Sequence, residues 1–397
     1  MVCCLLFPAL LGSSLRHRDG PTVISHPAEV AFGREIVFSA TAQSAEPVLD
    51  ATVVVVDSFS KSVAYPAEVI AGDGYSLTAR RDLQAEPVFP FSSIGYWWEV
   101  RFASGEIIVS PRQSLQYLDD RFSWQTLKKG RATVGWVEGD SRAAEDAADL
   151  LLLDLGTISA DLDSPIPDDV SLYIYPRLAD FHSGLGKLIS GWEGALSDPA
   201  SGIILLAAAS GAEGRQSLAT LLPHETVHIL LGAKWKDAYA LLPLWLVEGT
   251  AAGYETELRP EADRALREAA AGGDLIPMAA LCRTFPSDTR PALLAYAESK
   301  SFVAFLRQTY GLAAIRAAME SYAAGATCPQ GWVGPTGKSV DVLEASWRAQ
   351  LSGKQGWMIT TWSLVLGAAV LLAAVLAAGW VIRRRRGHSS LEGNQTK

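Results

Sequence analysis

The stretch "HETVH", residues 224–228, places two histidines four positions apart, with a glutamate beside the first. On a helix, residues four apart differ by about 40° in direction and about 6 Å in height, so His224 and His228 would point at one spot. Two imidazoles in that arrangement can share one metal ion. Glu225 would project about 100° away from His224 and could act on a water as general base without binding the metal itself. The pattern therefore indicates a zinc site, and the alternative is two histidines on a polar helix face.

A third ligand has to come from elsewhere, because catalytic zinc takes three protein ligands and keeps a fourth position for water. Glu248 stands 20 residues after His228 in "WLVEG", within a segment that begins after Pro243 and ends near Pro260. A helix, a loop and a second antiparallel helix would return its carboxylate to the imidazoles. We predict His224, His228 and Glu248 as the metal ligands and zinc as the cofactor, although this donor set does not exclude iron.

These motifs resemble a known group of enzymes. "HETVH" followed by "WLVEGTAAGYE" is similar to the gluzincin zinc metallopeptidases, which have thermolysin-like or aminopeptidase-like catalytic domains; over about residues 200–350 the chain most resembles the peptidase MA-like family. The segment "AYAESKSFVAFLRQTYG" resembles the helix with the transition-state tyrosine in the aminopeptidase branch, which implies that Tyr296 holds the oxyanion. The resemblance implies a peptidase that hydrolyses peptide bonds with a metal-activated water, and Glu225 as its general base.

Departures from the relatives favour an endopeptidase. Val247 stands where the aminopeptidase branch usually has asparagine, and the Gly-Ala-Met-Glu-Asn strand that binds a substrate's amino terminus is absent, "SGAEG" at residues 210–214 being read as a turn. A metzincin extension would need glycine and histidine where this chain has Leu231 and Lys234. The only later histidine is His388, so a tyrosine has to replace thermolysin's histidine donor.

Other residues near the motifs have two interpretations each. Glu255 lies seven positions after Glu248 on the same helical face, and it either orients a ligand histidine or belongs to a solvated acidic face. Tyr254 and Tyr310 are predicted to be core residues. The run "IILLAAA", residues 203–209, is either an edge strand that pairs with an extended peptide or a buried strand of the sheet.

The surrounding sequence predicts an α+β fold class. Residues 21–116 alternate β-branched or aromatic runs with turn signals, which is typical of a β-sandwich. Residues 117–352 are predicted to form the mostly helical, thermolysin-like (gluzincin) metallopeptidase domain, with strands first and helices later. An amphipathic helix is expected to begin at Ser141, and Pro223 is expected in the first turn of the zinc helix, capped by Thr220.

Both ends of the chain carry targeting signals. Residues 357–382 are uncharged for longer than the roughly 20 residues of a spanning helix, which predicts a transmembrane helix, and residues 383–397 form a basic tail that would stay cytoplasmic. Residues 1–20 resemble a signal peptide without a basic start. We therefore expect a single-pass protein of the cell membrane with an extracytoplasmic large domain; a weak export signal would instead leave that domain in the cytosol.

Charge and cysteine content narrow the partners. The net charge is −9, and residues 1–382 carry −13 because the last fifteen residues hold five basic residues and one acidic residue. Nucleic acid is therefore excluded as a partner of the outer part, and we expect a peptide or protein substrate. Cys282 and Cys328 are read either as a disulfide or as free thiols. The sequence leaves the oligomeric state open.

A competing function belongs to a different class. The chain could be a catalytically inactive surface binding or scaffold protein that retains the metallopeptidase fold. Glu225 argues against this alternative, because a purely structural zinc ion has no use for a base beside its water.

Overall fold

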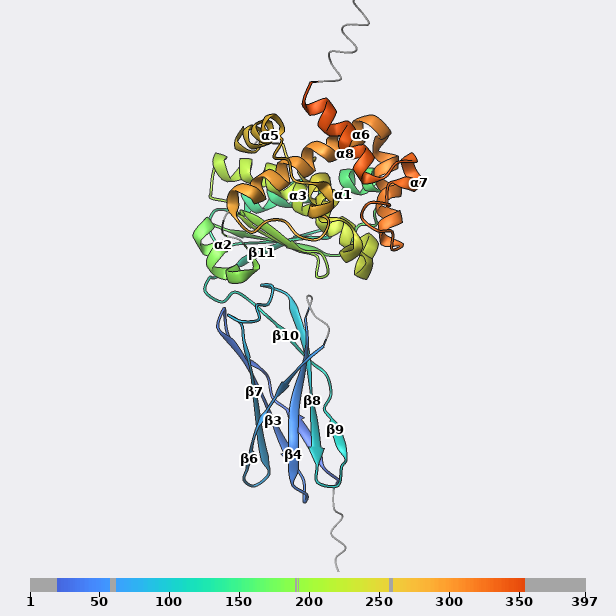
Figure 1. Cartoon of the computed structure of the whole chain (residues 1–397). Helices are drawn as coiled ribbons and strands as arrows, with labels where there is room; N and C mark the ends of the chain where they lie inside the picture. The colour runs from blue at the N-terminus through green and yellow to red at the C-terminus, as the bar shows by residue number, and fades with distance from the viewer. Residues whose placement is uncertain (1–19, 58–61, 190, 192, 257–259, 354–397) are drawn as a thin grey trace, which may run out of the picture. The chain divides into compact units, whose positions relative to one another are not determined.

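The computed structural model describes residues 20–57, 62–189, 191, 193–256 and 260–353 (Figure 1). They fall into two compact units. The first contains the residues up to Gln125 together with Tyr175–Glu193, and the second contains Thr126–Ile174 and the residues from Gly194 onward. Of the predicted signal peptide at residues 1–20, the structure describes only Gly20. The predicted transmembrane helix and basic tail, residues 357–397, lie outside the described residues.

Two antiparallel sheets make up most of the first unit. One sheet has the order β1-β3-β7-β6, with β2 beside β3, and the other has the order β10-β8-β4-β5, with β9 beside β8. The strands are β1 (Thr22–Ser25), β2 (Glu29–Ala31), β3 (Glu35–Gln43), β4 (Val48–Val56), β5 (Val63–Pro66), β6 (Glu68–Ala71), β7 (Tyr75–Asp82), β8 (Ser93–Phe102), β9 (Ile107–Val109) and β10 (Gln113–Gln116).

Alternating burial explains how the two sheets pack. In β3 and β8 every second residue is buried, because successive side chains of a strand point to opposite faces. The inward-facing residues of both sheets form one hydrophobic core, in which Phe38 of β3 contacts Tyr96 of β8 with ring centroids 5.0 Å apart. The described strands of this unit therefore form a β-sandwich.

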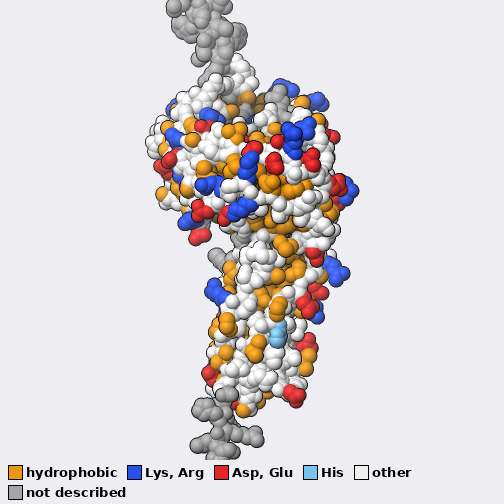
Figure 2. Space-filling view, turned by 180° about the vertical axis from the view of Figure 1, so that it is seen from behind, with side chains coloured by type: hydrophobic (Ala, Val, Ile, Leu, Met, Phe, Trp, Pro, Cys, Tyr) orange, Lys and Arg blue, Asp and Glu red, His pale blue; other side chains and the backbone are white. Residues whose placement is uncertain are grey.

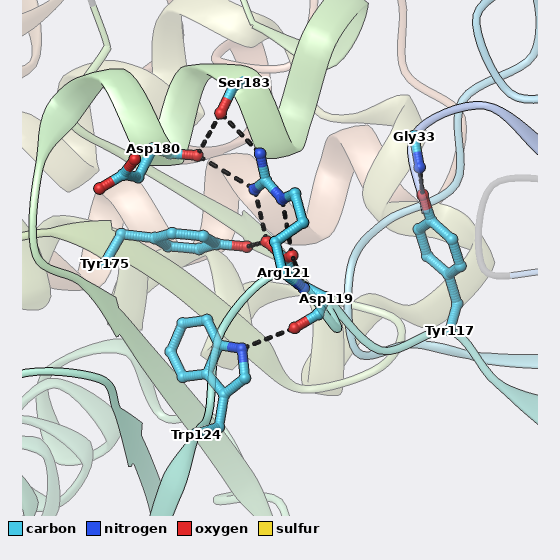
Figure 3. Close-up of polar contacts among 8 residues, drawn as sticks. All are labelled: Gly33, Tyr117, Asp119, Arg121, Trp124, Tyr175, Asp180 and Ser183. Atoms are coloured by element: carbon cyan, nitrogen blue, oxygen red, sulfur yellow. Dashed lines mark hydrogen bonds and ion pairs between the residues drawn. The ribbon is translucent and has the colours of Figure 1, made fainter. Parts of the chain in front are cut away.

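A polar cluster ties the segment Tyr175–Glu193 to the rest of the first unit (Figure 3). Arg121 donates to both carboxylate oxygens of the buried Asp119, at 2.7 and 2.6 Å, and to Ser183 Oγ at 2.7 Å. The Tyr175 hydroxyl donates to the same Asp119 carboxylate at 2.9 Å. The segment contains α2 (Leu178–Leu185) and η1 (Gly186–Leu188), and the chain then enters β14 of the second unit.

The second unit has one mixed sheet with the order β11-β12-β13-β15-β14. Its strands are β11 (Gln125–Lys129), β12 (Ala132–Trp136), β13 (Val170–Tyr175), β14 (Ala195–Asp198) and β15 (Ile203–Ala207). β12 and β13 are parallel, whereas β14 runs antiparallel to β15 and lies at the edge. The run 203–209 therefore contributes the inner strand β15, and the edge strand beside it was not predicted.

The helices of the second unit are α1 (Ser141–Leu162), α3 (Ala212–Trp235), η2 (Lys236–Leu241), α4 (Leu244–Ala252), α5 (Pro260–Gly272), η3 (Met278–Leu281), α6 (Thr289–Ala323), α7 (Val333–Thr336) and α8 (Val340–Leu351). Because α1 lies between β12 and β13, the predicted order of strands first and helices later holds only after β15. The predicted start of α1 at Ser141 is confirmed, and Asp140 caps it by accepting from Ala143 N at 3.1 Å. Helices α1 and α3 contact each other and both contact the sheet. Cys282 and Cys328 form a disulfide.

The membrane part of the sequence prediction needs correction. Within the described residues, no helix combines the length and the apolar character that crossing a membrane requires. The long helices carry charges along their length, as α6 does at Lys300, Arg307 and Arg316, and Figure 2 shows acidic and basic side chains mixed over the helical unit. This finding overturns the predicted fold class, which included one C-terminal transmembrane helix, together with the single-pass membrane localisation and the membrane as a partner.

Candidate metal centre

Helices α3 and α4 bring the three predicted metal ligands together. His224 and His228 lie one turn apart on α3, with ring centroids 5.1 Å apart. Glu248 lies on α4, and its Oε2 is 3.4 Å from His224 Nε2 and 3.8 Å from His228 Nε2. One ligand atom from each residue lies within 4.8 Å of the others. The two imidazoles and the carboxylate thus converge on one point between the two helices.

The helix that carries the histidines begins earlier than predicted, so Pro223 is inside it rather than in its first turn. A proline there has no N–H for the carbonyl four residues earlier, which is that of Ala219. The Thr256 hydroxyl donates to this carbonyl at 3.1 Å and lies 3.2 Å from Thr220 Oγ1. The Thr256 hydroxyl therefore replaces the backbone hydrogen bond that Pro223 cannot make in α3. Because Thr256 follows Glu255, this contact fixes the end of the α4 segment against α3.

The second nitrogen of each imidazole has its own partner. Glu255 Oε1 lies 3.0 Å from His224 Nδ1, and the Tyr239 hydroxyl lies 3.0 Å from His228 Nδ1. With Nδ1–H donating to these oxygens, each Nε2 faces Glu248 and would bind a metal ion through its lone pair once it is deprotonated. Partners of this kind fix the tautomer and the ring orientation of metal-binding histidines. Lys300 Nζ is 3.4 Å from the other oxygen of Glu255.

Glu225 points from α3 toward the edge strand of the sheet. Its carboxylate is buried, and Ser197 Oγ of β14 donates to Glu225 Oε2 at 2.6 Å. A hydroxyl that donates to an ionised carboxylate forms a charge-assisted hydrogen bond, which orients the acceptor. Glu225 is therefore held next to the edge strand β14.

The electrostatics of the site favour a positive charge. Burial lowers the pKa of the His224 imidazole, but hydrogen bonds with Glu248 and Glu255 raise it, and the net pKa is about 10. Burial raises the pKa of Glu248, whereas the charges and hydrogen bonds of His228 and His224 lower it, and the net shift is downward. Three carboxylates, including that of Glu225, thus surround two imidazoles in a buried position where charges interact strongly.

The donor set fits a zinc ion by its geometry. Bonds of about 2.0–2.1 Å in a tetrahedral site separate neighbouring ligand atoms by about 3.3 Å. The separations of 3.4 and 3.8 Å between Glu248 Oε2 and the two Nε2 atoms are close to this value. Two imidazoles and one carboxylate also leave the fourth position that a catalytic zinc site requires.

The predicted tyrosines lie in different places. Tyr296 is on α6, one turn before Lys300, and packs edge-to-face on Phe285 with ring centroids 4.9 Å apart. Its predicted role as oxyanion donor stays a prediction. Tyr254 and Tyr310 are partly buried residues that pack against the core. Tyr254 also donates from its hydroxyl to Asp161 Oδ2 at 2.9 Å.

Sequence reasoning missed Tyr239 and Ser197. Tyr239 lies in η2, a 3-10 helix between α3 and α4, and Ser197 lies in the short strand β14. Neither belongs to a motif, and both contacts depend on how distant segments pack. Only the position of Ser197, at the sheet edge just before the predicted strand at 203–209, could have suggested a neighbour of the site.

The family comparison agrees with this geometry. The family model of the Peptidase MA superfamily matches residues 152–353, a little over half of the 397 residues, and includes α3 and α4. The chain therefore belongs to the Peptidase MA superfamily, and the expected relation to peptidase MA-like gluzincins is confirmed. No curated protein sequence matches the chain.

Solved structures show only distant similarity. A mutant M1 zinc metallopeptidase of Deinococcus radiodurans, solved with a Tyr-Ser-Ala substrate, is 12% identical, with 84% of this chain and 94% of that chain covered and a TM-score of 0.37. An aminopeptidase N family protein of Idiomarina loihiensis is 10% identical, with 72% and 67% covered and a TM-score of 0.35. The sensor domain of an anti-sigma factor of Pseudobacteroides cellulosolvens is 13% identical, with 25% and 89% covered and a TM-score of 0.19.

Proposed function

We propose that the protein is a zinc-dependent peptidase in which His224, His228 and Glu248 bind the metal and Glu225 is the general base. One observation carries the proposal. Both Nε2 atoms face Glu248 Oε2, at 3.4 and 3.8 Å, while both Nδ1 atoms are held by Glu255 and Tyr239 at 3.0 Å. This is the arrangement by which proteins orient histidines toward a metal.

A zinc ion held by His224, His228 and Glu248 would act as a Lewis acid. When bound, it polarises the substrate carbonyl and makes a water molecule easier to deprotonate. The buried carboxylates around the site would offset the charge of a bound dication, which neutral donors alone would not do.

Glu225 moves the protons. It takes a proton from the attacking water and passes it to the nitrogen of the leaving amine, so it acts first as base and then as acid. Ser197 supports the first step because its hydroxyl donates to Glu225 Oε2 and so orients the carboxylate beside β14. Tyr296 is the proposed donor to the oxyanion that forms on the substrate.

The edge of the sheet offers a place for the substrate backbone. β14 pairs with β15 on one side and is the last strand of the sheet order, and its Ser197 contacts the proposed base. An extended peptide can add to such an edge through main-chain hydrogen bonds. A peptide bound in this way extends past both ends of the four-residue strand, which favours internal cleavage and hence an endopeptidase.

The experiment is a peptide-library digestion with the full-length zinc-loaded protein, wild type beside Glu225→Gln. The wild type is expected to cleave within peptides, and the variant is expected to bind the same amount of zinc without cleaving. Equal product from both proteins would remove the proposed mechanism. Zinc binding without cleavage by the wild type would instead support an inactive scaffold protein, and release of single terminal residues would replace the endopeptidase with an exopeptidase.

A further inference from the structure

A cavity lies between α4 and α6, and the three proposed metal ligands are not among the residues that line it. It has a volume of about 440 Å³, which is within the range of about 300–1,000 Å³ for small-molecule sites. Gly249, Gly253 and Tyr254 line it from α4 and the residues that follow it, and Val303, Ala304 and Arg307 line it from α6. Gly253 projects about 140° around the helix axis from Glu248, so the cavity lies on a different face of this segment from the metal ligand.

The cavity exists because the two helices touch at one point and then separate. At Gly249 a Cβ atom would come within 2.3 Å of Ser299 O and within 2.6 Å of Val303 Cγ2, so α4 and α6 are in direct contact there. One turn later, the three atoms nearest to a Cβ at Gly253 all belong to its own turn, out to 4.0 Å. The space between the helices therefore opens after Gly249.

A bend in α6 closes the far end. Gly311 has a φ of 81° and a ψ of 168° inside α6, a conformation that glycine adopts without steric cost. Leu312 and Ile315, which follow the bend, also line the cavity. Aliphatic side chains thus form one part of the wall, beside the polar side chains of Thr250, Lys300 and Gln308, and an aliphatic ligand body would leave water when it packs against them.

Two cationic side chains line the cavity, Lys300, whose Nζ is 3.4 Å from Glu255 Oε2, and Arg307. The Arg307 guanidinium is 3.5 Å from Asp161 Oδ2, a carboxylate oxygen that already accepts a hydrogen bond from the Tyr254 hydroxyl at 2.9 Å. The Arg307 side chain is 46% exposed, and a guanidinium has five donors in a fork that matches a carboxylate. A carboxylate at the cavity mouth could therefore bind Arg307 without displacing Asp161.

From these features we infer that the cavity binds a small ligand with an aliphatic body and one carboxylate, whose carboxylate pairs with Arg307 while its body lies between Gly253, Val303 and Ala304. A free fatty acid and the carboxyl-terminal fragment of an apolar peptide share this chemistry. The inference does not depend on the proposed peptidase activity, because binding is measured without turnover.

The test is isothermal titration calorimetry on the full-length protein with decanoate below its micelle concentration, with N-acetyl-leucyl-leucine and with decanol. We expect one saturable site for at least one of the two carboxylates, and at least tenfold weaker binding of decanol than of decanoate if the fatty acid is the source. Binding of the dipeptide alone would identify a peptide end as the source.

Variants separate the cavity from other binding. Arg307→Gln should weaken carboxylate binding at least about tenfold, because it removes the cation and the forked donors that pair with the ligand's carboxylate. The matched control is Arg290→Gln, which changes an 87% exposed arginine of the same helix and should leave affinity unchanged. Ala304→Phe, which fills the cavity, should abolish binding while the protein stays folded by circular dichroism. Absence of saturable binding by both carboxylates, or equal affinity of Ala304→Phe and wild type, would overturn the inference.

Discussion

Glu255→Gln should weaken zinc binding through a residue that does not bind the metal. Glu255 Oε1 is 3.0 Å from His224 Nδ1, and its side chain is only 4% exposed, so the hydrogen bond is charge-assisted and shielded from water. Loss of such a partner typically costs 10–100-fold in metal affinity, which corresponds to about 1.4–2.8 kcal/mol. Glutamine keeps the size and an acceptor oxygen, so the lost charge is what the variant measures.

Tyr239→Phe gives the matched comparison on the other histidine. The hydroxyl also lies 3.0 Å from its Nδ1, but it is neutral because burial raises the pKa of Tyr239. A neutral hydrogen bond contributes about 0.5–1.5 kcal/mol, so we expect zinc binding to weaken about 2–12-fold. Lys300→Met is the control for the other contact of Glu255, and its 37% exposed ion pair should change affinity less than about fivefold.

The assay is competition for zinc between the metal-free protein and a chromophoric chelator at one fixed pH. The order of affinities should be wild type, Lys300→Met, Tyr239→Phe and Glu255→Gln, from tightest to weakest. Zinc affinity of Glu255→Gln equal to that of the wild type, in a protein with an unchanged melting temperature, would refute the role of Glu255. A larger loss in Tyr239→Phe than in Glu255→Gln would refute the argument from charge.

Three further perturbations test other parts of the structure. Ser197→Ala should lower kcat about tenfold with unchanged KM and zinc content, because it removes the hydrogen bond that orients the Glu225 carboxylate. Ser197→Thr should restore activity, and a change in KM alone would contradict this role. Burial raises the pKa of Glu298 to about 7 from its ordinary 4.5, so the stability that its protonated form contributes is present below about pH 4.5 and is lost as the pH rises through 7. The melting temperature of Glu298→Gln should therefore rise relative to that of the wild type between pH 5 and 8. Parallel plots of melting temperature against pH for the two proteins would disprove the shift. Breaking the Cys282–Cys328 disulfide by double alanine substitution should lower the free energy of unfolding by about 4 kcal/mol for a separation of 46 residues, and a denaturant midpoint equal to that of the wild type would contradict this.

Local spacing predicted the parts of the site that depend on one helix or on two neighbouring helices. His224 and His228 face the same way because helical geometry requires it. The 20-residue interval to Glu248 is long enough for the chain to leave the first helix, reverse direction and begin a second helix. The start of α3 was predicted wrongly, because proline is commonest in the first turn of a helix. Inside α3 the hydrogen bond that Pro223 cannot make is replaced by the Thr256 hydroxyl, a contact that no local sequence pattern shows.

Contacts between distant segments set the rest. The edge position of β14 follows from the sheet order, and only that order brings Ser197 to Glu225. The sandwich was predicted from alternation, because one buried face per strand produces it directly. The sequence did not predict that the segment Tyr175–Glu193 belongs to the first unit. This assignment depends on the Asp119–Arg121 cluster rather than on periodicity.

The most direct test of the proposed metal site is the crystal structure of the zinc-soaked full-length protein with anomalous scattering measured at the zinc edge. We predict one ion bound about 2.0–2.1 Å from His224 Nε2 and His228 Nε2 and about 2.0–2.2 Å from a carboxylate oxygen of Glu248. An ion bound elsewhere at full occupancy, or one held by the two histidines with Glu248 beyond bonding distance, would contradict it.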